Sequence, residues 1–465
     1  GLGDVYKRQI CIGLCLFGIR GRMGYNPIKV SQAYYCEDPF LNQLGVNPVF
    51  NLLTSTLDDN RKENRTLHLM SEEDALSKVQ KYLHRQGIDW LSPIARKVER
   101  EGTPNRRNVV LVFMESMSAN LMGTFGSDKK LTPYLDSLYQ QSLSFSHFYS
   151  SGIHTNHGIY STLYSFPAIM KRNAMKGSVI PVYSGLPTVL QENGYCNLFF
   201  MTHESQYDNM NAFLRTNGFD EIYAQENYPS EKVVNSFGVQ DDFMYQYALP
   251  ILNERAGTGN PFFSVLLSIS NHPPYVIPPY FHPHSDVLEE QIVEYADWSI
   301  RQFMQAAEKQ PWFDNTIFVF LGDHGKMVGT PECEMPQSYN HIPLMIYGKD
   351  IKPGVYDGFG GQVDVSPTLL GLLNISYLQN NFGVNLLEEE RPCMFFTADN
   401  LIGARDSVNM FIYSPDSQQE FKYKLEEGKL HAATGTDEEA FRNLKDYCFS
   451  MLQSTESLVK EHKTL

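Results

Sequence analysis

The stretch Thr316–Lys326, with the sequence TIFVFLGDHGK, constrains the fold more than any other part of the chain. Its apolar centre, Ile317–Leu321, is typical of a strand buried on both faces, and such strands belong to parallel sheets that alternate with helices. The strand runs directly into Asp323 and His324. Ligands of parallel sheets bind just beyond the carboxyl ends of the strands. The pair fits two interpretations equally well, either metal ligands or an Asp helix cap beside a chance His.

The same order of strand and helix repeats between residues 108 and 375. Predicted strands and helices follow in the order Asn108–Met114, Pro133–Gln141 (helix), Leu143–Tyr149, residues 156–166 (helix), Leu186–Glu192 (helix), Cys196–Met201, Phe262–Ser268, Leu288–Glu308 (helix), Thr316–Leu321 and Leu344–Tyr347. In VDVSPTLLGLL, Ser366 as N-cap and Pro367 at the first helical position predict one more helix. The pattern predicts an α/β domain with a central, mostly parallel sheet between helices.

From about Arg391 the pattern changes to shorter strands, followed by a helix from about Glu438. This change predicts a small C-terminal antiparallel sheet and a helix.

Charge and cysteine content exclude some classes of protein. The formal net charge of −15 argues against a surface that binds nucleic acid. The seven cysteines are dispersed and show neither a disulfide framework nor zinc-finger spacing, so we expect buried free thiols.

The N-terminal region has its own character. The apolar run Ile10–Ile19 is too short for a bilayer, which needs roughly 20 residues; it fits a signal-peptide remnant, a short buried segment or the tail of a membrane helix. Residues 24–103 are first rich in Asn, Pro and Tyr and then charged, with a helix start at Ser71. They indicate a linker or stalk.

Four apolar strands end in polar residues that favour metals or phosphate. These residues are Glu115, His203, His272 and the pair Asp323–His324. Because the ends of parallel strands lie at one edge of a sheet, we expect these side chains to converge. A single such residue is more often a cap or a surface group, but four of them favour a site.

Glu115, Asp323 and His324 offer two carboxylates and one imidazole, a set that suits Mn²⁺ or Zn²⁺, with Mg²⁺ as a further possibility. Thr155 lies close to the start of the helix predicted at 156–166, where the helix dipole favours an anionic group. A metal would activate this hydroxyl as a nucleophile. The alternative is that Thr155 only caps the helix.

Several motifs occur in an order that resembles a known family. They are VVLVFMES, the Thr of SSGIHTNHGIYSTLYSFP, SNHPPY, FLGDHG, YNHIPL and VDVSPTLL. The chain resembles the sulfatase-like members of the alkaline phosphatase superfamily. More narrowly, it resembles the lipoteichoic acid synthase-like group of phosphoglycerol and phosphoethanolamine transferases. The resemblance covers roughly residues 105–380.

The resemblance implies an organisation and a location. Residues 1–23 would be the remnant of a transmembrane helix, 24–103 a linker, 104–380 the catalytic domain and 381–465 a subdomain packed on it. The protein would be anchored in a bacterial cell (inner) membrane through a missing N-terminal helical region. Its catalytic domain would lie on the extracytoplasmic or periplasmic side.

The resemblance also implies a mechanism. One divalent metal ion, typically Mn²⁺, would be held by Glu115, Thr155, Asp323 and His324. Thr155 would take the headgroup phosphate from a phospholipid donor and pass it to a glycan or lipid-linked acceptor of the cell envelope. His272 and His203 would contact the substrate.

The sequence departs from the synthases after His203. Their Trp and Arg that hold the glycerol-phosphate are absent from Glu204–Phe213, ESQYDNMNAF, so the headgroup stays open between phosphoglycerol and phosphoethanolamine. A hydrolase of the same superfamily, a phosphodiesterase or sulfatase, is the alternative. Sulfatases carry a C/S-x-P-x-R motif, whereas the loop at Thr155 has neither the Pro nor the Arg.

Other histidines near these motifs need a role as well. His341 and Asp286 would supply ligands in a two-metal site, although packing is the preferred interpretation of His341. His154 and His157 flank Thr155, and we expect them to pack in the loop or to face the acceptor.

Overall fold

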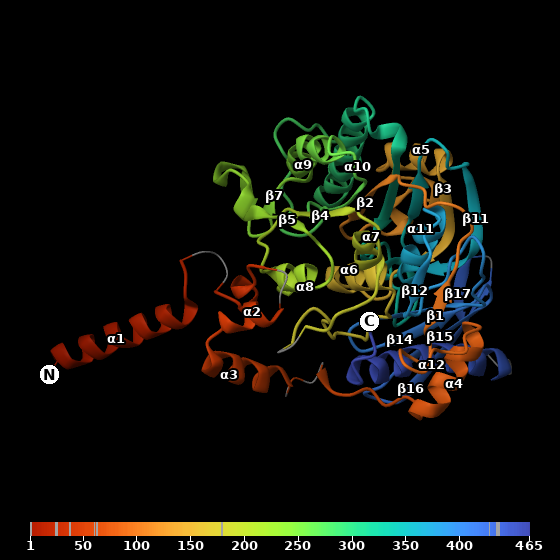
Figure 1. Cartoon of the computed structure of the whole chain (residues 1–465), viewed down its shortest axis with the longest axis horizontal. Helices are drawn as coiled ribbons and strands as arrows, with labels where there is room; N and C mark the ends of the chain where they lie inside the picture. Colours follow the sequence, from red (N-terminus) through yellow and green to blue (C-terminus); the bar gives the residue numbers. More distant parts are fainter. Residues whose placement is uncertain are drawn as a thin grey trace.

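The structure is a computed structural model that describes residues 2–23, 27–36, 39–59, 61, 64–177, 180–426, 428–433 and 438–465. Figure 1 shows a central sheet between helices, a smaller sheet formed by the C-terminal region, and an N-terminal helix that projects away from the body.

The described residues form a central sheet of eight strands in the order β11-β3-β10-β9-β2-β8-β4-β5. Neighbouring strands run parallel except β10, which is antiparallel to both β3 and β9. The predicted mostly parallel sheet is therefore confirmed. In sheet order the strands are β11 (Gly354–Gly361), β3 (Leu143–Tyr149), β10 (Leu344–Tyr347), β9 (Thr316–Gly322), β2 (Asn108–Met114), β8 (Phe262–Leu267), β4 (Cys196–Met201) and β5 (Glu221–Tyr223).

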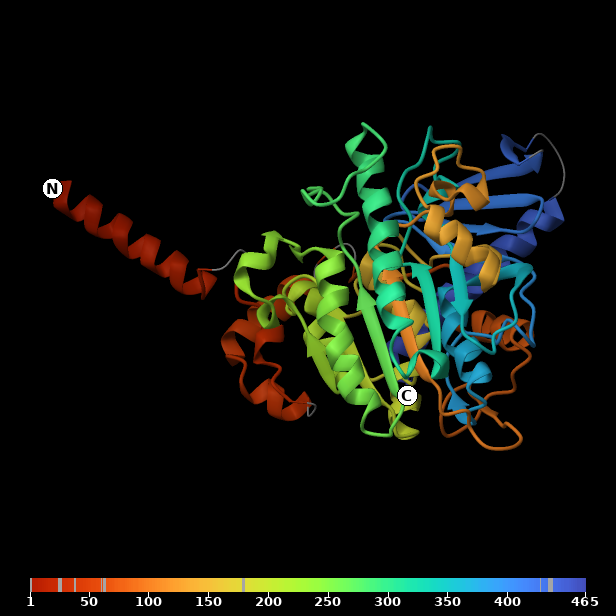
Figure 2. The same ribbon diagram turned by 90° about the horizontal axis from the view of Figure 1, so that it is seen from above.

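Helices cover both faces of this sheet, as the buried strands require. Along β2, Val109, Leu111 and Phe113 belong to one apolar cluster, whereas Val110 and Val112 belong to the other. The first cluster includes residues of α6 (Thr155–Tyr164), α7 (Leu186–Glu192), α8 (Met210–Thr216) and α11 (Val365–Leu372). The second includes residues of α5 (Pro133–Gln141), α9 (Asp241–Ala256) and α10 (Leu288–Ala307), of which α9 and α10 are the green helices across the sheet in Figure 2.

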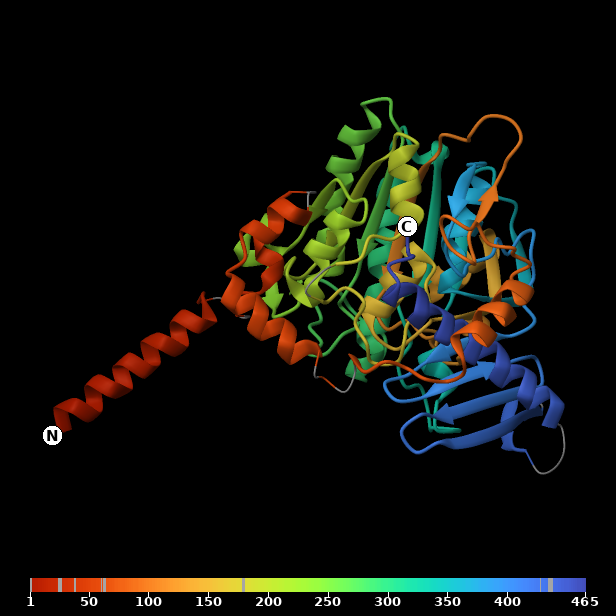
Figure 3. The same cartoon turned by 60° about the horizontal axis from the view of Figure 1, so that its bottom comes forward.

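The C-terminal region forms the predicted antiparallel sheet and helix. The strands, in sheet order, are β13 (Met394–Thr397), β14 (Ile402–Arg405), β15 (Asn409–Ser414), β16 (Gln419–Glu426) and β17 (Lys429–Ala432). Helix α12 (Glu438–Lys460) contacts β13, β14 and β15 (Figure 3). It also contacts α4 (Glu72–Tyr82), whose N-cap Ser71 accepts a hydrogen bond from the Asp74 backbone amide at 3.2 Å, as predicted.

Small elements complete the fold. These are β1 (Arg96–Val98), paired with β12 (Tyr377–Gln379), and β6 (Val233–Asn235), paired with β7 (Gly238–Val239).

One predicted helix start is wrong. Helix α11 begins at Val365 after a 3-10 turn at Gln362–Asp364, so Asp364 rather than Ser366 is the N-cap. The preceding turn already directs the chain into the helix, and Ser366 and Pro367 lie within the first helical turn, where Pro sacrifices no helical hydrogen bond.

The N-terminal region is helical. Helix α1 (Leu2–Arg20) projects from the body in all three views, and α2 (Pro39–Leu44) and α3 (Pro48–Asp59) lie closer to it. Among the described residues, no helix combines the length and the apolar character that a membrane crossing needs. That residues 1–23 are the remnant of a transmembrane helix stays a prediction.

Candidate metal centre and nucleophile

Glu115 and Asp323 follow two adjacent parallel strands. The register pairs Met114 of β2 with Gly322 of β9, so the next residue of each strand lies opposite the other. Both continue the alternation that turns Val109, Leu111 and Phe113 toward the face covered by α6. Both side chains are buried, at 1% and 0% exposure. The sheet therefore places two carboxylates face to face beneath α6.

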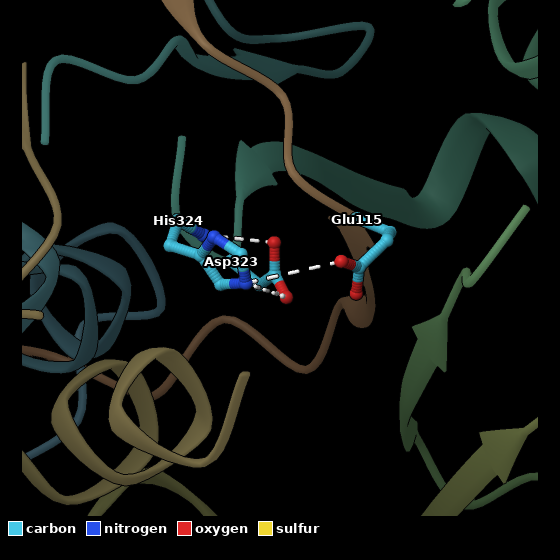
Figure 4. A group of neighbouring side chains, drawn as sticks. All are labelled: Glu115, Asp323 and His324. Carbon is cyan, nitrogen blue, oxygen red and sulfur yellow. Dashed lines mark hydrogen bonds and ion pairs between the residues drawn. The ribbon is translucent and has the colours of Figure 1, made fainter. Parts of the chain in front are cut away.

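His324 turns its imidazole toward these carboxylates (Figure 4). Its Nδ1 lies 2.8 Å from the backbone carbonyl oxygen of Gly325, a contact in which Nδ1 is the donor. Nε2 lies 3.5 Å from Asp323 Oδ2 and 3.8 Å from Glu115 Oε1. Since the backbone fixes Nδ1 as the protonated nitrogen, Nε2 keeps its lone pair for a cation.

The electrostatics of the group favour a bound cation. One ligand atom from each of the three residues lies within 4.8 Å of the others, and this is the group with metal-ligating potential among the residues that the structure describes. Burial, and secondarily the charge of Asp323, raises the pKa of Glu115 well above its ordinary value. Asp323 Oδ1 accepts hydrogen bonds from the amides of Ser116 and His324, both at 2.8 Å, but buried Oδ2 has no hydrogen-bond partner in the described structure. A divalent cation would satisfy that oxygen and remove the repulsion, so these residues fit such an ion.

Thr155 joins this group at the start of α6. The N-cap of α6 is His154 and Thr155 is the first helical residue, so the alternative that Thr155 caps the helix is wrong. Its hydroxyl donates instead to Glu115 Oε2, at 3.4 Å. The position at the positive end of the helix dipole favours an alkoxide or a phosphoryl group at this oxygen.

Gly158 lets α6 approach the sheet this closely. A Cβ at Gly158 would lie 2.3 Å from the backbone oxygen of Asp323, so any side chain there would push the helix away. The small residue is thus part of what brings Thr155 to the carboxylates.

His272 and His203 lie at the ends of β8 and β4 but outside the group of three. His272 Nδ1 contacts the Pro273 carbonyl oxygen at 2.7 Å, and its ring lies 4.2 Å from that of Phe237. Burial and the nearby His324 lower the pKa of His272. His203 is buried, burial lowers its pKa as well, and its Nε2 has no hydrogen-bond partner among the described residues.

The histidines His154, His157 and His341 contact groups outside the group of three. His157 is buried, with Nε2 3.0 Å from the Arg172 carbonyl oxygen, and His154 Nε2 lies 2.5 Å from Asp399 Oδ1. His341 Nε2 contacts the Ser146 carbonyl oxygen at 2.9 Å, and its ring stacks on Tyr149, which supports its preferred interpretation as a packing residue. Asp286 is exposed, and the described residues provide no second metal group that includes it.

Sequence reasoning missed two polar residues beside the centre. Asn271 Nδ2 donates to the backbone oxygens of Glu115 and Ser116 at 3.0 and 3.3 Å, and Lys326 Nζ donates to Asn271 Oδ1 at 2.6 Å. Burial lowers the pKa of Lys326 to about 8. Asn271 directly precedes His272, and Lys326 directly follows the Gly-Asp-His-Gly segment. This proximity was the signal available in the sequence.

The departing segment Glu204–Phe213 also contributes an aromatic side chain. The Tyr207 ring lies 4.7 Å from that of His203. Burial, together with the charges of Asp208 and Glu115, raises the Tyr207 pKa to about 12. A neutral phenol therefore lies beside His203.

A cavity of about 490 Å³ lies next to the nucleophile loop. Its lining includes His154 and Asn156, which flank Thr155, and also Tyr207 and Asp208. Asn156 Nδ2 donates to Asp208 Oδ2 at 3.0 Å, which connects the nucleophile loop to the departing segment. The cavity thus adjoins the loop that holds Thr155, although neither Thr155 nor the group of three is among its lining residues.

Comparison with known proteins identifies the family. The Sulfatase family model matches residues 107–375. Lipoteichoic acid synthase-like YvgJ of Bacillus subtilis is 25% identical over 70% of this chain and 56% of its own length. Lipoteichoic acid synthase of Staphylococcus aureus is 23% identical over 76% of this chain and 58% of its own length. The chain thus spans little more than half the length of these curated relatives.

Solved structures share the fold. A protein of the alkaline phosphatase superfamily from Vibrio parahaemolyticus superposes with a TM-score of 0.77 at 24% identity, covering 87% of this chain and 99% of its own. The lipoteichoic acid synthase LtaP from Listeria monocytogenes superposes with a TM-score of 0.67 at 21% identity, covering 83% of this chain and 98% of its own. With the family match over residues 107–375, the chain belongs to the sulfatase family, and it is similar to lipoteichoic acid synthases and in its fold to a protein of the alkaline phosphatase superfamily.

Proposed function

We propose that this chain is the catalytic region of a metal-dependent transferase that moves a phosphoglycerol or phosphoethanolamine headgroup from a phospholipid to an acceptor of the bacterial cell envelope. The observation that carries the proposal is the Thr155 hydroxyl, which lies at the start of α6 and donates to Glu115 of the buried acidic group. The names of the curated relatives, lipoteichoic acid synthases, support phosphoglycerol transfer, although at low identity.

The proposed reaction has two steps that share Thr155. In the first, Thr155 Oγ1 forms a bond to the donor phosphorus, the bond from phosphorus to the diacylglycerol oxygen breaks, and that oxygen takes up the proton that Thr155 releases. In the second, the acceptor hydroxyl forms its bond to the same phosphorus, the bond to Thr155 breaks, and the acceptor's proton returns to Thr155. The headgroup phosphate thus moves through a covalent intermediate on Thr155.

The residues around Thr155 have distinct roles in this proposal. Glu115, Asp323 and His324 would hold the divalent ion, together with the Thr155 oxygen. When bound, the ion supplies positive charge that lowers the pKa of the hydroxyl and neutralises the phosphate. Mn²⁺ is the ion that we propose, and Zn²⁺ or Mg²⁺ would fit the same ligands.

His272 is the proposed proton carrier. With Nδ1 donating to the Pro273 carbonyl oxygen and the pKa of the ring lowered, Nε2 is unprotonated near neutral pH. It can therefore accept a proton before it delivers one to the leaving oxygen. His203 and Tyr207 would contact the headgroup. We also propose the membrane anchor and the extracytoplasmic location that the resemblance implies.

Sulfate-ester hydrolysis is less well supported. The residues after Thr155 are Asn156, His157, Gly158 and Ile159, so a sulfatase-type Pro and Arg are missing at their offsets. A phosphodiesterase would use the same metal ligands with water as the acceptor. The two activities differ in whether a lipid donor is needed.

Release of diacylglycerol from a fluorescent phosphatidylglycerol or phosphatidylethanolamine, in the presence of Mn²⁺, tests the proposal. We expect Thr155→Val, which keeps the shape but removes the hydroxyl, to reduce release by at least about a thousandfold, because a covalent nucleophile is lost. Thr162→Val, on the same helix, is the matched control and should release diacylglycerol like the unmodified protein. An unchanged rate in Thr155→Val would refute the nucleophile, and turnover of a soluble aryl phosphodiester with no lipid turnover would favour the hydrolase.

A further inference from the structure

Helix α3 (Pro48–Asp59) exposes its apolar face, whereas a helix on the surface of a water-soluble protein normally buries that face against the core. Its apolar residues lie within one helical stripe and are exposed: Val49 65%, Phe50 38%, Leu52 67%, Leu53 60% and Leu57 67%. Of the polar residues whose side chains are described, Asn51, Thr54 and Ser55 are half-buried and Thr56 is exposed. A helix that exposes its leucines and keeps most of its polar side chains against the protein needs an apolar medium on its exposed side.

The polar face of α3 adjoins the substrate cavity. Ser55 lines the cavity of about 490 Å³ that His154 and Asn156 line beside Thr155. Three basic side chains, Lys171, Arg172 and Lys176, line it too, and they pair with the carboxylates of Asp399, Glu456 and Asp208, of which only Asp208 also lines the cavity. One side of α3 thus meets a cavity with basic walls, and the other side presents an apolar surface.

We infer that α3 lies in the surface of a phospholipid bilayer, with Phe50, Leu53 and Leu57 among the acyl chains and the cavity opening toward the headgroups. Two observations favour a bilayer over a protein as the covering partner. First, α1 also exposes its large apolar residues, among them Ile10, Leu14 and Phe17, so the apolar surface extends along two separate helices rather than forming one compact patch. Second, the basic cavity wall complements an anionic phosphate.

The arrangement gives α3 a role in catalysis, and this part of the inference rests on the proposed function. A phospholipid donor has to present its phosphate to Thr155 while its acyl chains stay in an apolar medium. With α3 at the interface, only the headgroup of the lipid has to leave the bilayer, and the acyl chains stay in it. The reaction therefore avoids the cost of extracting whole acyl chains into water.

Flotation with vesicles of mixed phosphatidylcholine and phosphatidylglycerol tests the docking. Thr155→Val protein keeps the lipid intact during the measurement. We expect Leu53→Asn with Leu57→Asn, added to that protein, to weaken partitioning by about tenfold or more, because two inserted leucines are lost. Val355→Asn with Val408→Asn is the matched control, since these side chains are exposed on other elements, at 57% and 49%, and it should float unchanged.

A second measurement reports on membrane insertion of α3 alone. It is needed because α1, which also exposes apolar residues, is present in every variant. Trp introduced by Leu57→Trp should be quenched by lipids brominated on the acyl chains, whereas Trp introduced by Val408→Trp should not. Absence of quenching at position 57 would overturn the inference, and so would concentration-dependent self-association that the Leu53 and Leu57 changes abolish without a change in flotation.

The two proposals fail in different ways. If flotation and quenching behave as expected but no phospholipid is turned over by the unmodified chain, the transferase proposal fails while the docking stands. A phosphatidylglycerol with short, water-soluble chains gives the converse test. Its turnover should be equal in the unmodified chain and in a chain that carries Leu53→Asn and Leu57→Asn but keeps Thr155, because it needs no interface.

Discussion

Glu115 and Asp323 place two carboxylates in a part of the molecule that solvent does not reach, and one of their oxygens has no hydrogen-bond partner in the described structure. Such a pair destabilises the fold unless a proton or a cation compensates it. The pKa of Glu115 is raised for the same reason, because its charged form is unfavourable when it is buried beside Asp323. The stability of the protein should therefore depend on the bound ion and on pH together.

Removal of the divalent ion with a chelator should lower the Tm, and the loss should grow as pH rises. In the ion-free protein the pKa of Glu115 is higher in the folded than in the unfolded state, where it is near 4.5. The stability linked to its protonation is then complete below about pH 4.5 and is lost as pH rises toward the folded pKa. Scanning calorimetry from about pH 5 to about pH 8, with and without chelator, measures this.

Glu115→Gln supplies the control for that experiment. The variant should bind less metal by elemental analysis, and its ion-free Tm should fall less steeply with pH than that of the ion-free unmodified protein, because the repelling carboxylate is gone. A chelator that leaves the Tm of the unmodified protein unchanged at every pH would contradict the metal centre.

The residues of the metal group were predictable, but their neighbours were not. Glu115, Asp323 and His324 follow apolar strands directly, and strand ends in a parallel sheet meet at one edge. Asn271 contacts the backbone oxygens of Glu115 and Ser116, and Lys326 donates to Asn271, 55 positions away in the sequence; no local pattern encodes these hydrogen bonds. Whether Thr155 capped its helix also depended on tertiary structure, because the choice of His154 as N-cap follows from the approach of α6 to β9.

Helices α5 and α10 are joined by one buried carboxylate on the side of the sheet away from Thr155. Asp297 of α10 accepts hydrogen bonds from the amides of Tyr134 and Leu135 in the first turn of α5, at 3.1 and 2.8 Å. Burial nevertheless raises the pKa of Asp297 to about 7, from an ordinary value of 3.8. The junction is therefore stable mainly in its protonated form.

Asp297→Asn should remove a pH dependence from unfolding. Because the folded pKa exceeds the unfolded one, the folded state of the unmodified protein binds the extra proton, and its stability falls by about 1.4 kcal/mol for each pH unit between the two values. Relative to the variant, the unmodified protein should thus lose stability from about pH 4 to about pH 7. Urea denaturation at several pH values measures the difference, and parallel curves for the two proteins would contradict the assignment.

Helices and strands with a clear apolar pattern in the sequence were predicted, and those without such a pattern were missed. The buried strands of the central sheet are nearly continuous apolar runs, and helix α10 has an apolar stripe of period 3.6. Strand β11 contains four glycines and an irregularity in its register, and α9 contains Pro250, so neither has a local signal of its type. Tertiary pairing of β11 with β3 overrides its poor strand propensity.

The central-sheet region and the C-terminal unit are connected by a buried ion pair. Arg391, just before β13, donates to both oxygens of Asp364, the N-cap of α11, at 2.6 and 2.8 Å. It also donates to the Tyr447 hydroxyl of α12 at 2.8 Å. One guanidinium thus links three elements from separate parts of the chain.

Arg391→Met should reduce the free energy of unfolding by about 3–5 kcal/mol, because the Asp364 carboxylate stays buried without its partner. Arg391→Met with Asp364→Asn should recover part of that loss, since the uncompensated charge is removed. Chemical denaturation measures both. A loss of less than about 1 kcal/mol in the single variant would mean that the pair behaves like an exposed salt bridge.

At the scale of the whole molecule, the candidate site is assembled from several separate elements. The strand ends meet the start of α6 at Thr155, and the cavity connects the loop around Thr155 with Ser55 of α3, although these elements come from distant parts of the sequence. The sequence indicated the strand ends and the linker as separate features. Their spatial relation, and the inverted faces of α3, became apparent only with the burial of each side chain.

The central claim is that the headgroup phosphate becomes bonded to Thr155. The most direct test incubates the protein with phosphatidylglycerol and Mn²⁺ without an acceptor, quenches the reaction in acid, and maps the peptides by mass spectrometry. We predict a phosphoglycerol adduct on Thr155 that is absent in Thr155→Val and disappears when an acceptor is added before the quench. Diacylglycerol release with no adduct on Thr155 at any quench time, or with the adduct on another residue, would contradict the account.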